Sequence, residues 1–157
     1  MAQELMLLTP QGYAELEAEL EDLKVVKRKE LAERIKVAIS YGDLKENSEY
    51  HSAKNDQAFM ESRIKQIEHI LKNARIQESQ DASTVQLGST VILNDIEFAE
   101  RVEYRIVGAA EADVSQNKIS YESPLGKALM GQSVGARIEV AAPAGTIEYE
   151  LLEIKIG

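Results

Sequence analysis

Apolar residues in the early part of the chain recur every three to four positions, which is the spacing of one face of an α-helix. We expect this helix to begin near residue 10, because Thr9 is a candidate N-cap and Pro10 is a favourable first helical residue. Lys27 occupies a position where the pattern calls for an apolar residue, so the sequence predicts a local change of phase there. The apolar positions are Tyr13, Leu16, Leu20 and Leu23, followed after the break by Leu31, Ile35 and Ala38.

A second helical pattern follows and alternates regularly between spacings of three and four residues. Such a seam requires a partner helix, and the short connection between the two patterns makes the two helices antiparallel. The sequence therefore predicts a helical hairpin with arms of about 30 residues and about 45 Å. The seam positions of the second helix are Tyr50, Ala53, Gln57, Met60, Ile64, Ile67, Leu71 and Ala74.

The chain reverses in residues 41–50, a polar stretch that is rich in carboxylates. Gly42 can take the positive φ that ends a helix, and either Asp43 or Asn47 can cap the next one. Asp43 and Glu46 would then lie at the far end of the hairpin, where their carboxylates meet water or a partner.

The pattern changes after residues 77–83, a polar segment without apolar periodicity. We place the domain junction there, with a coiled-coil domain at 1–78, whose acidic tip is 41–49, and a globular domain at 79–157. Short β-prone runs separated by Gly, Asn, Asp and Pro follow, and they are typical of antiparallel strands. These runs contain Thr90, Leu93, Val102, Tyr104, Ile106, Ile138 and Val140.

The last run carries apolar residues on one face and then on the other, which predicts a β-bulge near residue 151. The segment Pro143-Ala144-Gly145 predicts the turn that precedes this strand. Ser123 and Pro124 are expected to begin a short helix that continues through Met130, with Gly131 ending it. The fold class is therefore α+β, a helical hairpin followed by an antiparallel sheet with a short helix.

The composition is that of a globular protein, with 157 residues of which 44% are hydrophobic. No apolar run approaches the ~18 residues of a membrane span, so we expect no membrane partner and a cytoplasmic location. The sequence contains no cysteine, which excludes disulfides, thiolate nucleophiles and cysteine-based zinc sites. The formal net charge of −9 argues against a protein that coats DNA by neutralising its phosphates.

Charge is segregated along the first helix, with acidic residues in its first half and basic residues in the half nearer the tip. This arrangement has two interpretations, a solvated helix face of mixed charge or a local contact with RNA or DNA. The acidic residues are Glu15, Glu17, Glu19, Glu21 and Asp22, and the basic ones are Lys24, Lys27, Arg28, Lys29, Arg34 and Lys36.

The motifs of an autonomous enzyme are missing from the sequence. His51 and His69 are its only histidines, and on one helix they would lie about 27 Å apart, too far to share a metal. No glycine-rich phosphate loop and no His-Glu zinc motif is found. The sequence therefore predicts that the protein is not a hydrolase by itself.

Asp43 and Glu46 have two interpretations. Placed one helical turn apart, their carboxylates can converge on a hard cation such as Mg²⁺, which prefers six oxygen ligands. Two carboxylates are too few, so such an ion would have to be shared with a partner or substrate. The alternative is a capping box, with Asp43 as N-cap and Glu46 bonded back to its N–H. The spacing alone favours the capping box.

Residues 42–54, Gly-Asp-Leu-Lys-Glu-Asn-Ser-Glu-Tyr-His-Ser-Ala-Lys, closely resemble the signature of the Gre transcript cleavage factors of bacterial RNA polymerase. The resemblance extends over the whole chain, including the Ser123-Pro124-Leu125 segment and Gly131. It implies a coiled coil that enters the secondary channel of the polymerase and an FKBP-like C-terminal domain that docks at the channel rim. It reverses the preference for the capping box.

By this resemblance, Asp43 and Glu46 are the catalytic and metal-binding residues, which help the polymerase hold its second Mg²⁺ while it cuts the 3′ end of backtracked RNA. No cofactor would be bound by the protein alone. Lys36, Lys45 and Lys54 would lie near the RNA, and Ser123, Pro124 and Leu125 would contact the polymerase. Ile39 stands where a basic residue is often found, which favours the branch of the family that acts on short backtracks.

Two other functions remain open from the sequence. A regulator of the same shape could enter the channel and inhibit the polymerase, although its tip acids would usually be altered. A coiled-coil adaptor without a role at a nucleic-acid active site would be expected to have an apolar tip, and Leu44 is the only large aliphatic residue of the loop.

Overall fold

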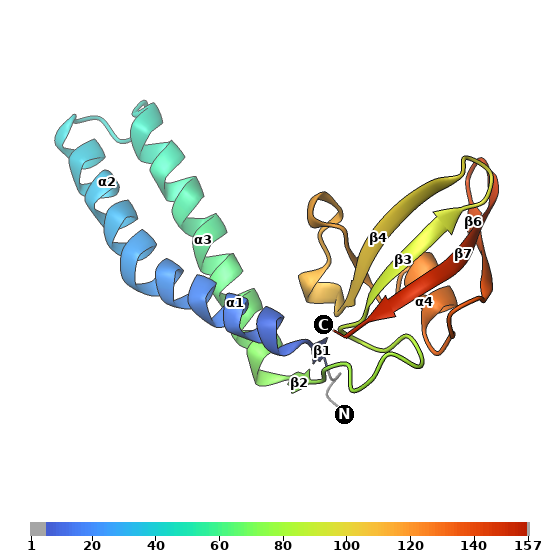
Figure 1. Ribbon diagram of the computed structural model, residues 1–157. Coiled ribbons are helices and arrows are strands. Elements are labelled where there is room, and N and C mark those ends of the chain that lie inside the picture. Colours follow the sequence, from blue (N-terminus) through green and yellow to red (C-terminus); the bar gives the residue numbers. More distant parts are fainter. Residues whose placement is uncertain (1–5, 157) are drawn as a thin grey trace, which may run out of the picture. The chain divides into compact units, whose positions relative to one another are not determined.

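The computed structural model describes residues 6–156 (Figure 1). These residues form two compact units. One, the arm, is Ala14–Asn73, and the other, the globular unit, consists of the described residues before and after the arm. By packing, residues 6–13 thus group with the C-terminal part of the chain, although they precede the arm in sequence. The expected boundary between residues 78 and 79 stays a prediction about the domains.

The arm begins in helix α1 (Pro10–Glu21) and continues through a π-helical segment, η1 (Asp22–Lys27), into α2 (Arg28–Ser40). The Thr9 hydroxyl accepts a hydrogen bond from Gly12 N at 3.1 Å, which confirms the expected start of the helix. The π-helical segment coincides with the predicted change of phase. Its wider turn takes up one extra residue and returns the apolar positions to the seam.

Helix α3 (Ser48–Lys72) lies beside α2 and runs back along it (Figure 1). The seam between the helices buries apolar side chains at helical spacing, which confirms the predicted antiparallel hairpin. Helix α3 is shorter than expected, because it ends at Lys72 and Ala74 begins a strand. The buried residues of the seam are Leu16, Ala38, Ala53, Met60, Ile64, Ile67 and Ile70.

Ion pairs connect the two sides of the arm at its surface. The Arg63 guanidinium donates two hydrogen bonds to the Glu19 carboxylate, at 2.7 and 2.9 Å, and these hold the pKa of Glu19 below its ordinary value. Arg28 forms a similar two-bond pair with Glu61. Because such exposed pairs contribute little energy, the buried seam is the main source of the hairpin's stability.

A pair of short parallel strands, β1 (Met6–Leu8) and β2 (Ala74–Ile76), belongs to the globular unit and was not predicted. The strands flank the arm in sequence, and Gln77 N donates to Leu8 O at 2.8 Å just beyond their pairing. Each strand has only three residues, too short for a β pattern to be seen in the sequence.

The globular unit contains a curved sheet of β3 (Thr90–Asp95), β4 (Glu100–Val107), β5 (Lys118–Ser120), β6 (Arg137–Ala142) and β7 (Gly145–Lys155). The strand order is β5-β4-β3-β7-β6. The predicted antiparallel pairing holds for β3, β4, β6 and β7, but β5 pairs with β4 in parallel, so the sheet is mixed. Two short 3₁₀ turns, η2 (Ala109–Glu111) and η3 (Val114–Gln116), make the connection that this parallel pairing requires.

The core of the globular unit lies between the sheet and helix α4 (Pro124–Leu129). The predicted bulge is confirmed in β7, because Ile92 pairs with Glu153 while Leu93 pairs with Leu151. The predicted turn before β7 is also confirmed, since Ala142 pairs with Gly145. The buried core residues are Val85, Val91, Leu93, Ile106, Leu129, Ile138, Leu151 and Ile154.

Among residues 6–156, no helix is both long and apolar enough to cross a membrane.

Candidate functional site

The tip of the arm is the loop between α2 and α3, residues 41–47. Tyr41 N and Gly42 N donate to the carbonyls of Ala38 and Ile39 at 3.2 Å and so close the end of α2. Gly42 has φ of +102°, the left-handed conformation that glycine adopts without strain. The expected helix-ending role of Gly42 is therefore confirmed.

Asn47 fastens the other end of the loop to both helices. Its Oδ1 accepts a hydrogen bond from Tyr50 N at 3.0 Å, which caps α3, and its Nδ2 donates to the carbonyl of Ala38 at 2.6 Å. Asn47 is thus the N-cap of α3, one of the two candidates that the sequence offered. The capping box of Asp43 and Glu46 is wrong, because both residues precede the helix.

Within the loop, the backbone of Lys45 is held on both sides. Asp43 Oδ1 accepts a hydrogen bond from Lys45 N at 3.1 Å, and His51 Nε2 lies 3.0 Å from the carbonyl oxygen of Lys45. Asp43 and Glu46 therefore lie in a braced non-helical loop, and not one helical turn apart as the metal interpretation assumed.

The side chains of Asp43 and Glu46 are exposed at this tip. Carboxylate oxygens are the ligands that Mg²⁺ prefers, so the pair suits that ion chemically. In the part of the chain that the structure describes, however, no three His, Cys, Asp or Glu side chains come together as a metal site would require. The two carboxylates thus fit a Mg²⁺ site chemically, and the remaining ligands of such a site would have to come from a partner.

The three lysines predicted to lie near RNA come from different segments around the tip. Lys36 is in the last turns of α2, Lys45 is in the loop and Lys54 is in the second turn of α3, and all three are exposed. Lys54 Nζ donates to Gln57 Oε1 at 3.2 Å, a contact within α3. The tip therefore carries exposed cationic side chains as well as carboxylates.

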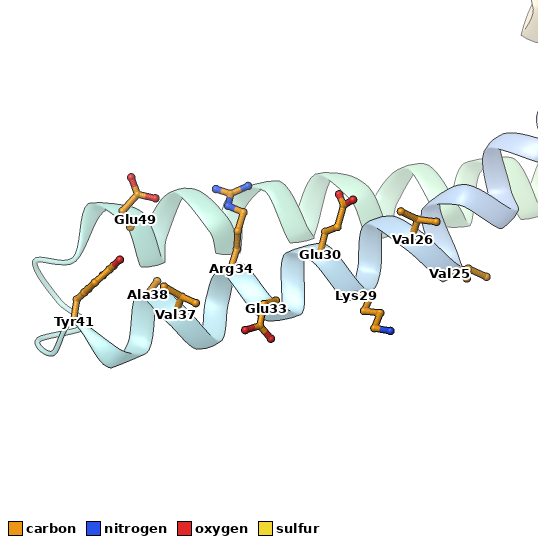
Figure 2. A pocket seen from close by; sticks show the side chains of 10 residues that line it. All are labelled: Val25, Val26, Lys29, Glu30, Glu33, Arg34, Val37, Ala38, Tyr41 and Glu49. Carbon is orange, nitrogen blue, oxygen red and sulfur yellow. The ribbon is translucent and has the colours of Figure 1, made fainter.

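One side of the arm below the tip has an open groove of about 810 Å³. Figure 2 shows that its lining comes mostly from η1 and α2, with Glu49 contributed by α3. Its larger apolar residues remain exposed, by 62% for Val25, 43% for Val37 and 71% for Tyr41. Clustered exposed apolar side chains are typical of surfaces that contact a partner.

The segment expected to dock on the polymerase begins helix α4. Ser123 Oγ accepts a hydrogen bond from Gly126 N at 3.1 Å and donates to Ser120 O at 2.7 Å, so Ser123 has the expected capping role. Pro124 is exposed, whereas Leu125 is partly buried against the core. Of the three predicted residues, Pro124 is therefore the most accessible to a partner.

The sequence interpretation missed two contacts that organise the tip. It offered Asn47 as a cap of one helix without its second bond to the other, and it gave His51 no role in the loop. A histidine in the first turn after a loop gives no signal of its own, because its contact with Lys45 depends on how the loop folds back.

Comparisons with known proteins agree with this description. Residues 6–76 match the family "Transcription elongation factor, N-terminal", and residues 80–156 match "Transcription elongation factor, GreA/GreB, C-term". A transcription elongation factor GreA of Acetivibrio thermocellus is 55% identical over 152 residues, covering 96% of both chains. Another from Clostridium acetobutylicum is 54% identical over 151 residues, which cover 95% of this chain and 96% of the relative.

Among solved structures, the GreA factor homolog 1 of Thermus thermophilus is 33% identical, with 97% of this chain and 99% of that chain covered and a TM-score of 0.45. The two family matches together span nearly all of the described residues, and the curated relatives agree with them. This chain belongs to the GreA/GreB family of transcription elongation factors. The function that goes with this family is stimulation of transcript cleavage in backtracked RNA polymerase complexes, so the cleavage activity is that of the polymerase.

Proposed function

We propose that the arm enters the secondary channel of bacterial RNA polymerase and brings Asp43 and Glu46 to the active site, where backtracked RNA is cut at its 3′ end. The observation that carries this proposal is the pair of exposed carboxylates on a braced loop at the end of the arm. The groove along η1 and α2 supports insertion, because its exposed apolar residues would be covered by the channel wall.

Asp43 and Glu46 would add two oxygen ligands to a Mg²⁺ that the polymerase holds incompletely. In two-metal phosphoryl chemistry, one ion activates water and the other stabilises the leaving oxygen. Asp43 Oδ1 is used inside the loop by Lys45 N, which leaves Oδ2 and the Glu46 carboxylate for the ion. The chain's own contribution is to carry these charges and to fix the backbone between them.

Lys36, Lys45 and Lys54 would face the nascent RNA, since they surround the same tip and carry charge opposite to that of the phosphates. The proposed partner, bacterial RNA polymerase, supports a cytoplasmic location.

Docking at the channel rim would use Ser123, Pro124 and Leu125. Pro124→Asp is the suitable test, because Pro124 is exposed at the first position of α4, where an acidic residue is favoured by the helix dipole. The variant should keep its fold by circular dichroism and compete less well for polymerase. Unchanged competition would remove Pro124 from the interface.

The proposed role of the tip is tested with stalled, backtracked elongation complexes. Asp43→Asn and Glu46→Gln keep the shapes of the side chains and remove their charges. Each variant should lose most of the stimulated RNA cleavage, bind the polymerase like the wild type and recover partly at higher Mg²⁺ concentration. Wild-type cleavage by both variants would contradict the metal assignment.

A further inference from the structure

The contact between His51 and the tip loop has a role that the acids alone do not explain. We infer that His51 is a positioning residue for Glu46, because its ring holds the peptide group that joins Lys45 to Glu46. This inference rests on the proposed function, in which Glu46 supplies a ligand to Mg²⁺.

The chemistry of the contact fixes the proton. The carbonyl oxygen of Lys45 can only accept a hydrogen bond, so Nε2 of His51, at 3.0 Å, must donate. The neutral ring therefore carries its proton on Nε2, and the bond survives protonation of the ring because Nε2 stays a donor. The inference thus concerns geometry, and not a pH switch.

His51 is well placed for this task because it stands on a rigid element. Its own N–H donates to Asn47 O at 3.1 Å as part of the first turn of α3. Its ring also packs edge-on against the Tyr50 ring, with centroids 5.6 Å apart and an interplanar angle of 68°. The ring thus transfers the fixed orientation of α3 to a loop that has no regular structure.

The loop depends on few other contacts between residues 43 and 46. Among the described residues, Glu46 has no hydrogen bond or ion pair of its own, and Lys45 N is held by Asp43, itself one of the proposed ligands. Without His51, no hydrogen bond would hold the peptide group between Lys45 and Glu46, and the nearest fixed points would be Lys45 N, held by Asp43, and the capping residue Asn47. Each acid would then adopt a wider range of positions, and a misplacement of about 1 Å in a reacting complex can cost 100-fold in rate.

The experiment compares His51→Ala, His51→Gln and, as a matched control on the exposed surface of the same helix, His69→Ala. Glutamine places an N–H donor at nearly the distance of Nε2, whereas alanine provides none. Cleavage of backtracked RNA is measured as a function of factor concentration, so that the saturating rate and the half-saturating concentration are separated.

We expect His51→Ala to lower the saturating rate by about 10-fold and to leave the half-saturating concentration unchanged. The rate falls because the loop loses one hydrogen bond and Glu46 is partly misplaced. His51→Gln should return the saturating rate to within about 2-fold of the wild type, because glutamine restores the donor. The control His69→Ala should have the wild-type rate. The inference would be overturned if His51→Ala had the wild-type rate or if His51→Gln did not recover it. It would also be overturned if the substitutions changed only the half-saturating concentration. A wild-type protein that stimulates no cleavage would instead contradict the proposed function.

A second measurement does not need the polymerase. Nitrogen NMR of the full chain should find the neutral His51 ring protonated at Nε2, and the Glu46 amide resonance should move in His51→Ala and return in His51→Gln. Protonation at Nδ1, or an unmoved Glu46 amide, would overturn the contact itself.

Discussion

Gly12 provides a test in which a general rule of helix stability should reverse. Replacing glycine by alanine within a helix usually stabilises it by about 1 kcal/mol. In this protein a Cβ on Gly12 would lie 1.9 Å from Glu111 Oε1 and 2.0 Å from its Cδ. Because the end of a glutamate side chain is flexible, the sign of the effect depends on what holds that carboxylate in place.

The Glu111 carboxylate is held by three donors, all within the globular unit. Its Oε2 accepts from Thr9 N at 2.9 Å and from Gly108 N at 3.3 Å, and its Oε1 accepts from the Thr9 hydroxyl. Thr9 is only 1% exposed and cannot turn to water instead. Displacing the carboxylate should therefore cost about 3 kcal/mol.

Subtracting the helix gain of about 1 kcal/mol leaves Gly12→Ala destabilised by about 2 kcal/mol. In urea unfolding followed by circular dichroism, this corresponds to a midpoint lowered by about 1 M. The same substitution in a Glu111→Ala background should stabilise the protein, because the obstacle is gone. A Gly12→Ala variant at least as stable as the wild type, or the same sign in both backgrounds, would refute the reasoning.

Two further predictions concern the arm. Ile64→Ala should lower the free energy of unfolding by about 2–5 kcal/mol in urea titrations, since Ile64 is 1% exposed in the seam. A loss below about 1 kcal/mol would contradict this and would mean that the seam closes over the cavity. Arg63 lowers the pKa of Glu19 in the folded protein. Their pair therefore contributes its full stabilisation above the pKa that Glu19 has in the unfolded chain, and it loses this contribution as the pH falls through the lower pKa of the folded state. Glu19→Gln should therefore make the free energy of unfolding depend less on pH between these two pKa values, by no more than about 1 kcal/mol for so exposed a pair. The same pH dependence in the variant and the wild type would contradict this.

The sequence was informative wherever structure follows local periodicity. The slip at Lys27 predicted the position of η1, and the change of face after Leu151 predicted the bulge in β7. Both are shifts by one residue in a repeating pattern, and one side chain on the wrong face is enough to reveal such a shift.

The sequence was uninformative where structure depends on contacts between distant residues. Strands β1 and β2 have three residues each, and the seam pattern ran on to Ala74, so nothing marked the end of α3 two residues earlier. The contact of Thr9 with Glu111 joins residues 102 positions apart and leaves no local signal. At the tip, only the resemblance favoured Asp43 and Glu46 as site residues, whereas their spacing pointed to a capping box.

The spacing was misleading at the tip because a single residue makes the hydrogen bonds that cap both helices. A loop closing two antiparallel helices must satisfy the end of one helix and the start of the next, and the second task can be done by Asp as well as by Asn, Ser or Thr. Here the neutral Asn47 serves both helices, through Oδ1 to Tyr50 and Nδ2 to Ala38. Because that one amide closes the hairpin, Glu46 is not needed for capping, and its charge remains exposed at the end of the arm, where the proposed metal ligand must be.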